Sequence, residues 1–376
     1  MSIDYNNRTI TIRTLGPVFI GNGRSVNKKE YIFDRTAGKM YFFDVKKMYD
    51  GLCAKKLGDQ YEEYLMDGYG DLYGFLKHNQ IPEMQYKKWI NRAVAVGDPS
   101  MNLRSIKEVQ EFIKDPSGLP YIPGSSLKGM LRTILQVYEL LKSPDEETYR
   151  RISKNVQGEA FENRRRYHAR SDAALDQASF HRELFKNKDG LYDLKDQNND
   201  VLRGLYIGDS EPISADDLCV CEKIDMLPNG DTRTLNLLRE CIKPFVCVSF
   251  PVTIDKTICP YTMNEIMRAM KAFYQYYNNL FADHFSKAPE VKGNSTTFYL
   301  GGGAGYVSKT VTYGLISGKA GVTTVSEILD NTVAPNDRRR HDHAGDPVRG
   351  VSPHMMKCTK YKNKLYQMGA CCLIKI

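Results

Sequence analysis

The sequence predicts an α+β fold whose sheets are mainly antiparallel, and three observations support this class. Strand-like segments, which alternate apolar and polar residues or are rich in β-branched and aromatic residues, occur in both halves of the chain. Two long segments with helical periodicity lie among them, at residues 127–141 and about 263–285. The elements do not follow the regular alternation of a doubly wound parallel sheet.

The N-terminal region predicts a group of strands. Residues 9–15 alternate with a period of two, and Gly16-Pro17 stops them. A short extended segment follows, and Gly21-Asn22-Gly23 breaks it. From residue 45 to about 111 the spacing becomes partly helical with glycine interruptions, which predicts an insertion of short helices. Two further strands are expected before this insertion, at 31–33 and 40–45.

The clearest helix lies in the middle of the chain. Residues 121–124 are expected to end a strand, and apolar residues then recur with helical spacing over 127–141. Ser125 or Ser126 is a natural N-cap for this helix. Residues 144–205 are highly charged, so we expect mobile helices and loops there, together with a domain junction.

The second half of the chain repeats the mixture of strands and one long helix. This interleaving in two blocks favours units such as the ferredoxin-like βαββαβ arrangement. A length of 376 residues favours two or three domains. We expect two, at 1–205 with helical insertions and at 206–376. Strands of the second half are expected at 206–208, 219–221, 245–254, 298–300, 355–360 and 368–376.

Composition limits the classes of function. Hydrophobic residues make up 41% of the chain and charged residues 26%, which is ordinary for a globular protein and argues against global disorder. The net charge of +8 fits a polyanionic partner without proving one. The 24 tyrosines could stack on bases, although most are expected to be half-buried in sheets.

The nine cysteines are scattered and form no CxxC pair, so no structural zinc site or other cofactor is expected. The N-terminus lacks an apolar leader segment, and no apolar run approaches the roughly 20 residues of a membrane span. We therefore expect a protein of the reducing cytoplasm with no membrane partner.

Three glycine-rich turns are the strongest candidate binding elements, because glycine lets the main chain approach an anion closely. In the second turn Lys128 and Arg132 lie four residues apart, which places them on one face of the helix near its positive end. A single glycine-rich turn of this kind more often only reverses the chain direction and binds no ligand. The three turns are 15–24 (LGPVFIGNGR), 122–129 (IPGSSLKG) and 300–310 (LGGGAGYVSKT).

The candidate RNA-contacting residues come from these turns. The first turn contributes two glycines on either side of an asparagine. The second turn contributes two serines, a lysine and an arginine. The third turn contributes four glycines, a tyrosine and a lysine. The predicted set is Gly21, Asn22, Gly23, Ser125, Ser126, Lys128, Arg132, Gly301, Gly302, Gly303, Gly305, Tyr306 and Lys309.

Other motifs in the sequence suggest different functions. The third turn lacks the lysine directly after glycine that a nucleotide-binding P-loop requires, and Gly318-Lys319 is followed by alanine, so an ATPase is not expected. The basic run 338–343 could be a mobile RNA-contacting loop or merely a solvated one. Residues 360–366 would present three lysines on one face of a strand, for an RNA backbone or as protection of an edge.

Catalysis has little support in the sequence. His341, Asp342, His343 and Asp346 could form a metal or acid–base site, but they lie in an apparent loop that would hold such a site poorly. No HExxH or GxSxG motif is present. We therefore expect a protein that is not an enzyme. A ribonuclease that uses His341 or His343, and a scaffold that touches only proteins, stay open as alternatives.

The three turns, together with Leu238-Arg239-Glu240-Cys241-Ile242, resemble the RAMP superfamily of CRISPR-associated proteins. The proline-glycine-serine-serine element of the second turn is shared across that superfamily. The third turn, continuing to Val307-Ser308-Lys309-Thr310, is similar to the fifth subunit of Csm-type (type III-A) effector complexes. The resemblance spans nearly the whole chain in order and spacing.

This resemblance implies two ferredoxin-like (RRM-related, RAMP) domains with helical insertions. It implies a subunit that caps the 3′ end of the CRISPR RNA and supports its 3′-end maturation in antiviral defence, without cutting the target. The implied partners are the 3′ region of the CRISPR RNA, the backbone RAMP subunits, the small helical subunit of the complex, and host nucleases. The alternative is a RAMP-type endoribonuclease that processes precursor RNA.

Overall fold

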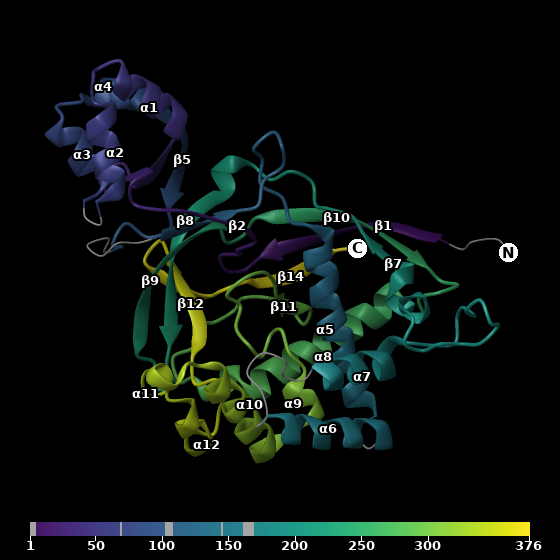
Figure 1. Cartoon of the computed structure of the whole chain (residues 1–376). Coiled ribbons are helices and arrows are strands. Elements are labelled where there is room, and N and C mark those ends of the chain that lie inside the picture. The colour runs from purple at the N-terminus through teal and green to yellow at the C-terminus, as the bar shows by residue number, and fades with distance from the viewer. Residues whose placement is uncertain (1–4, 68–69, 102–107, 144–145, 161–168) are drawn as a thin grey trace.

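The computed structural model in Figure 1 describes residues 5–67, 70–101, 108–143, 146–160 and 169–376. Its strands form two sheets, and all but two of the strand pairings described are antiparallel. The predicted mixed α+β class is confirmed. The five-stranded sheet has the order β11 (Thr297–Tyr299), β14 (Ala370–Lys375), β1 (Tyr5–Thr14), β10 (Cys247–Asp255) and β7 (Leu205–Ile207).

Two long helices, α5 (Gly124–Lys142) and α8 (Met263–Leu280), pack on the five-stranded sheet. Along the chain the order is β1, α5, β7, β10, α8 and β14, and in the sheet β14 lies beside β1, followed by β10 and β7. This is the strand order of a ferredoxin-like βαββαβ unit. Leu127 and Leu131 of α5 meet Ile266 of α8 over Ile12 of β1, because each helix turns its apolar stripe inward.

The second sheet is larger and lies beside the first in Figure 1. Two of its strands, β12 (Met356–Tyr361) and β13 (Lys364–Gln367), form a hairpin that joins the sheet through β8 (Leu218–Met226). The main order is β2 (Gly21–Val26), β6 (Glu108–Phe112), β9 (Thr232–Ile242), β8 (Leu218–Met226), β5 (Ile90–Val96), β4 (Lys39–Phe43) and β3 (Tyr31–Asp34), with β12 (Met356–Tyr361) and β13 (Lys364–Gln367) beside it.

Both sheets draw strands from either side of residue 205, the boundary expected between the domains 1–205 and 206–376. The ferredoxin-like unit itself begins at β1 and ends at β14, so it uses the two ends of the chain. In the larger sheet β5 pairs with β8, and β6 pairs with β9. A division at residue 205 therefore crosses both sheets, and two consecutive ferredoxin-like domains stay a prediction.

The predicted helical insertion is confirmed only in its first part. Four short helices, α1 (Val45–Cys53), α2 (Gly58–Met66), α3 (Leu72–His78) and α4 (Glu83–Tyr86), form a unit with its own apolar core around Trp89 and project from one end of the large sheet (Figure 1). The rest of the segment was predicted wrongly, because β5 and β6 occupy it. β5 alternates Ala93, Val94, Ala95 and Val96, a period that the flanking helical spacing masks.

The start of α5 also differs from the prediction. Neither Ser125 nor Ser126 caps the helix, which begins at Gly124. The carboxylate of Asp209 accepts a hydrogen bond from the Gly124 N–H at 2.8 Å. A Cβ at Gly124 would lie 2.2 Å from the Ile207 carbonyl oxygen, so glycine is needed for packing against β7.

Other local expectations changed as well. Residues 121–124 are not a strand, and only Pro120 forms a bridge there, to Lys114. Gly21-Asn22-Gly23 lies inside β2, whose pairing with β6 shifts register at this point. Residues 360–366 form the β12–β13 hairpin instead of one strand, because Lys362 and Asn363 adopt the left-handed conformation of its turn.

The charged segment contains two helices, α6 (Glu147–Glu159) and α7 (Ala169–Phe180), next to α5 in Figure 1. The expectation of mobile elements at 144–145 and 161–168 lies outside the described residues. The C-terminal helices are α9 (Thr312–Leu315), α10 (Gly318–Thr332), α11 (Arg338–His341) and α12 (Asp346–Arg349). Among the described residues, none of the helices is both long and apolar enough to span a membrane.

Candidate RNA-binding surface

The three glycine turns, which are far apart in the sequence, meet at one pocket of about 340 Å³. The first turn supplies Gly21, the second supplies Ser126, and the third supplies Lys309. The turns thus form a single surface that the chain assembles from the end of β11, the start of α5 and the start of β2. The pocket is lined by Ile20, Gly21, Ser126, Gly129, Met130, Thr133, Tyr299, Leu300, Gly301, Gly302 and Lys309.

The glycines allow the first and third turns to pack against each other. Gly301 has a positive φ of 83°, and a Cβ there would lie 2.2 Å from the Phe19 carbonyl oxygen. The Gly302 N–H donates to the same oxygen at 2.6 Å. A Cβ at Gly21 would meet the Phe19 ring at 2.8 Å. Three of the predicted glycines therefore shape the pocket wall by closing tightly around one phenylalanine.

Two cations flank the remaining glycines of the third turn. A Cβ at Gly303 would lie 2.1 Å from Nη1 of Arg239, and a Cβ at Gly305 would lie 3.7 Å from the Lys357 side chain. The guanidinium of Arg239 lies over the Phe19 ring, 5.1 Å from its centroid, and its Nε donates to Gln110 at 3.0 Å. The surface therefore places an arginine directly against the glycine-rich backbone.

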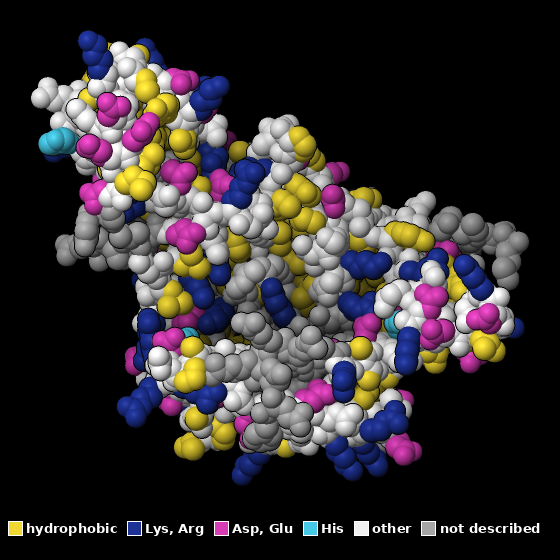
Figure 2. Space-filling view, in the orientation of Figure 1, with side chains coloured by type: hydrophobic (Ala, Val, Ile, Leu, Met, Phe, Trp, Pro, Cys, Tyr) yellow, Lys and Arg dark blue, Asp and Glu magenta, His cyan; other side chains and the backbone are white. Residues whose placement is uncertain are grey.

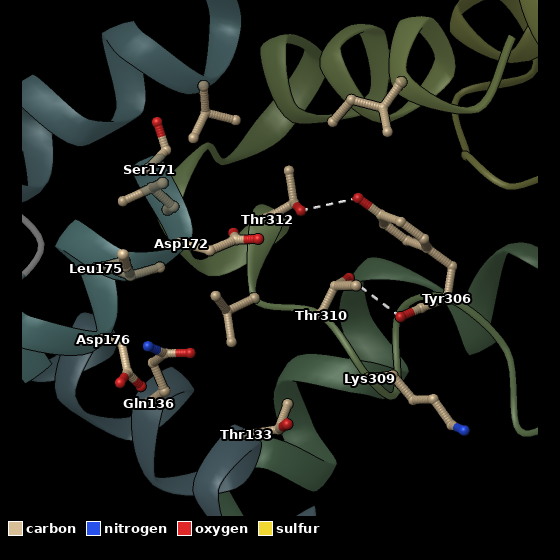
Figure 3. Close-up of a pocket in the computed structure, with 15 residues that line it drawn as sticks. Thr133, Gln136, Ser171, Asp172, Leu175, Asp176, Tyr306, Lys309, Thr310 and Thr312 are labelled. Carbon is tan, nitrogen blue, oxygen red and sulfur yellow. Dashed lines mark hydrogen bonds between the residues drawn. The ribbon is translucent and has the colours of Figure 1, made fainter. Parts of the chain in front are cut away.

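A second pocket, of about 550 Å³, adjoins the first and shares Thr133 and Lys309 with it. Figure 3 shows this pocket between α5, α7 and the segment after the third turn, with the Lys309 side chain extending away toward one edge. The Tyr306 hydroxyl and Thr312 Oγ1 are 3.0 Å apart. The ring of Tyr306 is thus half-buried and anchored, so it contributes to the wall of this pocket.

Two of the cations beside the third turn lack a carboxylate partner within the described residues. Neither Arg239 nor Lys309 forms an ion pair with any of the residues that the structure describes. Partial burial lowers the pKa of Lys309, and the nearby charge of Arg239 lowers it further. Burial also lowers the pKa of Arg239. These shifts are those of positive charges that a bound anion would stabilise.

Strand register extends this positive surface. Arg239 lies opposite Cys221 in β8, and Lys357 lies opposite Asp225. Lys223, two residues from each of these β8 positions, is on the same face of the sheet. Burial lowers the pKa of Lys223, and Lys357 lowers it further. We call Arg239, Lys309 and Lys223 the open cations. Lys357 is partly neutralised, because its Nζ lies 2.8 Å from Asp225.

Arg132, a predicted RNA contact, is bound within the protein. Its guanidinium donates two hydrogen bonds to Asp176, at 2.8 and 2.6 Å, and one to Asp200 at 2.8 Å. It also lies 4.7 Å from the centroid of the Phe180 ring. Burial alone would lower the pKa of Arg132, but the two carboxylates raise it. This arginine joins α5 to α7, so we assign it a structural role.

Lys128 and Arg132 also face away from the pocket. At about 100° per residue, they lie roughly a third of a turn around α5 from Ser126, Gly129 and Thr133, which line the pocket. Burial lowers the pKa of Lys128, while nearby Asp200 raises it. The two cations that the sequence placed beside the helix start therefore belong to a different side of the helix.

The last predicted contacts lie near the surface without lining either pocket described above. Asn22 and Gly23 are exposed in β2, and the Asn22 side chain accepts a hydrogen bond from the Arg24 N–H at 2.8 Å. Ser125 is exposed in the first turn of α5. In Figure 2, Lys and Arg side chains border the hollow at the centre of the face shown.

Sequence reasoning missed Arg239, Lys223 and Lys357 as contributors to this surface. Arg239 stood in a motif that supported the family resemblance, but nothing in the sequence alone showed which face of β9 it occupies. The relevant signal is the alternation around it, since Leu238 and Glu240 are buried while Arg239 is half-buried. Its approach to Gly303 depends on a contact between residues 64 positions apart.

The histidine-containing loop differs from the sequence interpretation. His341 is exposed in the short helix α11, whereas His343 is only 5% exposed. His343 and Asp346, which we expected in a poorly organised loop, are held together with His354 in the interior. Arg338 of the basic run pairs with Asp330 of α10 at 3.6 Å. The basic run is therefore partly helical, and Asp330 neutralises part of its positive charge.

The fold and this surface define the class of protein. A model of the RAMP superfamily matches residues 11–332. The chain belongs to the RAMP superfamily.

Curated relatives narrow the comparison. A protein of Mycobacterium tuberculosis named "CRISPR system Cms protein Csm5" is 28% identical to this chain over 386 residues, and the match covers 96% of both chains. A protein of the same name from Streptococcus thermophilus is 28% identical over 320 residues, and the match covers 83% of this chain and 82% of the relative. A third, from Enterococcus italicus, is 25% identical over 400 residues, covering 97% of this chain and 96% of the relative. The resemblance to the fifth Csm subunit, predicted from the turns, is confirmed.

Solved structures support the fold. A chain in the cryo-EM structure of a type III-A Csm–crRNA–target RNA ternary complex superposes with a TM-score of 0.60 at 16% identity, covering 98% of this chain and 100% of that chain. The crystal structure of T. onnurineus Csm5 gives a TM-score of 0.61 at 16% identity, covering 97% and 100%. Each superposition covers nearly the whole of both chains.

Proposed function

We propose that this chain is a non-catalytic RNA-binding subunit of a type III-A CRISPR effector complex, where it caps the 3′ end of the CRISPR RNA and supports maturation of that end. One observation carries the proposal: the three glycine turns converge on one pocket that Lys309 lines, and Arg239 packs against Gly303 of the same third turn. Relatives that match almost the full length carry the Csm5 name. The proposed function is thus supported by the pocket at the three turns and by the similarity to proteins named Csm5.

The surface suits an RNA backbone. The main chain at Gly301 and Gly302 lines the pocket, and Lys309 and Arg239 supply positive charge that no carboxylate pairs with in the described structure. Contacts of this kind hold phosphates and fix the register of the RNA without reading its bases. We therefore expect binding that tolerates different sequences and weakens with added salt.

The proposed partners follow from the same role. The subunit would contact the 3′ region of the CRISPR RNA, the neighbouring backbone RAMP subunits and the small helical subunit, and it would recruit host nucleases for trimming. We expect it to act in the cytoplasm, where its nine free cysteines would stay reduced.

A ribonuclease is the alternative function. His343 is buried, and its ring contacts the carboxylate of Asp346, so it is a poor candidate for attacking RNA. His341 is exposed and could still reach a ligand. Incubation of the purified protein with precursor RNA in the absence of metal tests this alternative. Cleavage that His341→Ala abolishes would favour the enzyme over our proposal.

The proposal is tested by the length of the RNA recovered from complexes assembled with and without this subunit. We expect uniform, matured 3′ ends with the wild-type chain, and longer or ragged ends without it. A Lys309→Ala/Arg239→Ala chain should behave like the omission. Unchanged RNA length in both cases would contradict a 3′-end role, and a lack of any RNA crosslink would favour a scaffold that touches only proteins.

A further inference from the structure

A group of buried side chains outside the RNA-binding surface lies in the segment that connects α10 to β12. His343, Asp346 and His354 are 5%, 0% and 6% exposed. One possible ligand atom from each lies within 4.8 Å of the other two, and no second group of this kind occurs within the part of the chain that the structure describes. The proposed function makes no use of these residues.

The three side chains meet at one carboxylate. Nδ1 of His354 lies 2.5 Å from Oδ1 of Asp346, and Nδ1 of His343 lies 3.2 Å from Oδ2. The Ser352 hydroxyl donates to Oδ2 at 2.7 Å. Arg349, at the edge of the group, approaches Oδ1 at 3.3 Å. Two imidazoles thus present the same ring nitrogen to a single buried anion.

We propose that His343, Asp346 and His354 bind a divalent transition-metal ion, with Zn²⁺ as the expected occupant. Imidazole nitrogen and carboxylate oxygen are common zinc ligands, with bonds of about 2.0–2.2 Å. Two ligand atoms of a tetrahedral site at such distances are roughly 3.3 Å apart. The His343–Asp346 contact already has this spacing, and the His354–Asp346 contact needs to lengthen by less than about 1 Å.

The charge of the group favours a cation. The Asp346 carboxylate is fully buried, and His343, His354 and Ser352 all contact it. The nearby Arg349 divides its charge between Asp346 and Asp342. The interior of the group therefore holds a negative charge that is only partly neutralised by protein.

The surroundings hold the three ligands in place. Ser326 of α10 donates a hydrogen bond to the His343 carbonyl at 2.7 Å. The Tyr313 hydroxyl of α9 donates to the Ser352 carbonyl at 2.5 Å and accepts from the Ser352 N–H at 3.1 Å. Such outer contacts orient the ligands of metal sites. The Ser352 hydroxyl or a water molecule could complete a fourth position.

A metal here would have a structural role near the RNA-binding surface. The segment from His343 to His354 contains a 3-10 turn and the short helix α12, and it leads directly into β12, which carries Lys357 beside Gly305. Linking both ends of the segment to one ion would fix the start of β12 against α9 and α10. The absence of a CxxC pair, which led us to expect no zinc site, does not bear on a histidine–aspartate site.

The test is metal binding by the untagged, full-length chain after metal removal. Titration with Co²⁺ should give the visible absorption of a tetrahedral site at one ion per chain, and Zn²⁺ should displace it. The thermal unfolding temperature should rise with Zn²⁺ and fall with a chelator. His343→Gln and His354→Gln should each weaken binding at least as much as the loss of an outer contact does, by about 10- to 100-fold.

Two further variants keep the test decisive. His284→Gln changes an exposed histidine outside the group and should bind metal as the wild type does. His354→Cys replaces one zinc ligand by another, so it should retain Co²⁺ and add a sulfur-to-metal charge-transfer band, even if the glutamine variants fold poorly. No stoichiometric binding by the wild type, or binding that survives both glutamine substitutions, would overturn the proposal.

Discussion

Two sets of cations lie close to each other in this protein but have opposite surroundings. Arg132 on α5 is held by Asp176 and Asp200, and the carboxylates raise its pKa. Lys309 and Arg239 beside the third glycine turn have no carboxylate partner in the described structure, and their pKa values are lowered. The first cation fastens two helices together, whereas the other two leave positive charge for a ligand.

A second neutralised group lies on the other face of the strand that carries Arg239. Glu240 is buried, and its carboxylate contacts Arg92 at 2.7 Å and Lys114 at 2.6 Å. It also accepts the Phe112 N–H at 3.0 Å, which links β9 to β6. Adjacent residues of β9 thus serve the core and the surface. A charged side chain that is already paired within the protein stabilises the fold, whereas one without a carboxylate partner can bind a ligand.

The largest expected effect comes from removing the anion of the neutralised group. Glu240→Gln leaves Lys114 without its carboxylate and Arg92 with Glu111 alone, so we expect a loss of about 3 kcal/mol in the free energy of unfolding. Urea unfolding followed by circular dichroism measures it. Stability within 0.5 kcal/mol of wild type, roughly the effect of an ordinary surface change, would contradict the structural role of this group.

The same carboxyl group gives a pH dependence. Burial would raise the pKa of Glu240, but Arg92 and Lys114 lower it below its ordinary value of about 4.3. Its stabilising contribution is therefore complete above that value and is lost as the pH falls through the lower folded-state pKa. Unfolding measured between pH 3 and 7 should show a smaller acid loss for Glu240→Gln than for wild type.

Lys309→Ala should affect binding and spare the fold. A hydrogen bond to a charged group contributes about 1.5–3 kcal/mol, so we expect roughly a tenfold to hundredfold loss in affinity for RNA. The slope of affinity against salt should fall by about one unit. Fluorescence anisotropy with labelled RNA at several salt concentrations measures both. Lys142→Ala, which removes an exposed lysine paired with Glu139, is the matched control.

Arg132→Gln should show the reverse pattern. Its partly exposed ion pairs contribute little each, so we expect a loss of about 1 kcal/mol in stability. RNA affinity should stay within twofold of wild type, because the side chain faces α7 and away from the pocket. A loss of affinity as large as that of Lys309→Ala, with normal stability, would restore Arg132 as an RNA contact.

The smallest effect concerns a glycine that packing does not require. A Cβ at Gly129 meets nothing within 4 Å, although this residue lies within α5 and lines the pocket. Gly129→Ala should therefore stabilise the helix by about 0.5–1 kcal/mol. If RNA approaches the backbone there, the same change should weaken binding. Greater stability with unchanged affinity would place the RNA elsewhere in the pocket.

The sequence predicted local features better than long-range ones. The helical periodicity of α5 and α8 was correct because each apolar stripe is continuous along the chain. The glycine turns were recognised from their composition, and their convergence places Gly21, Ser126 and Gly301 at one pocket. Strand β5 was missed because short helices precede it directly in the sequence.

The features of the site that the sequence left open share one physical cause. Whether Arg132 is free depends on Asp176 and Asp200, which lie 44 and 68 residues away along the chain. Whether Arg239 reaches the third turn depends on the register between β8 and β9 and on the position of Phe19. Sequence spacing places side chains within one element, but it does not show which element lies opposite.

Crosslinking to the CRISPR RNA tests the central claim most directly. Photoreactive uridines placed near the 3′ end of the RNA in a reconstituted complex should form adducts that mass spectrometry assigns to peptides of this chain. We predict adducts within 19–24, 126–133 and 301–309, lost or reduced in the Lys309→Ala/Arg239→Ala variant. Adducts confined to the hairpin at 360–366 or to 338–343, or no adducts on this chain, would contradict the account.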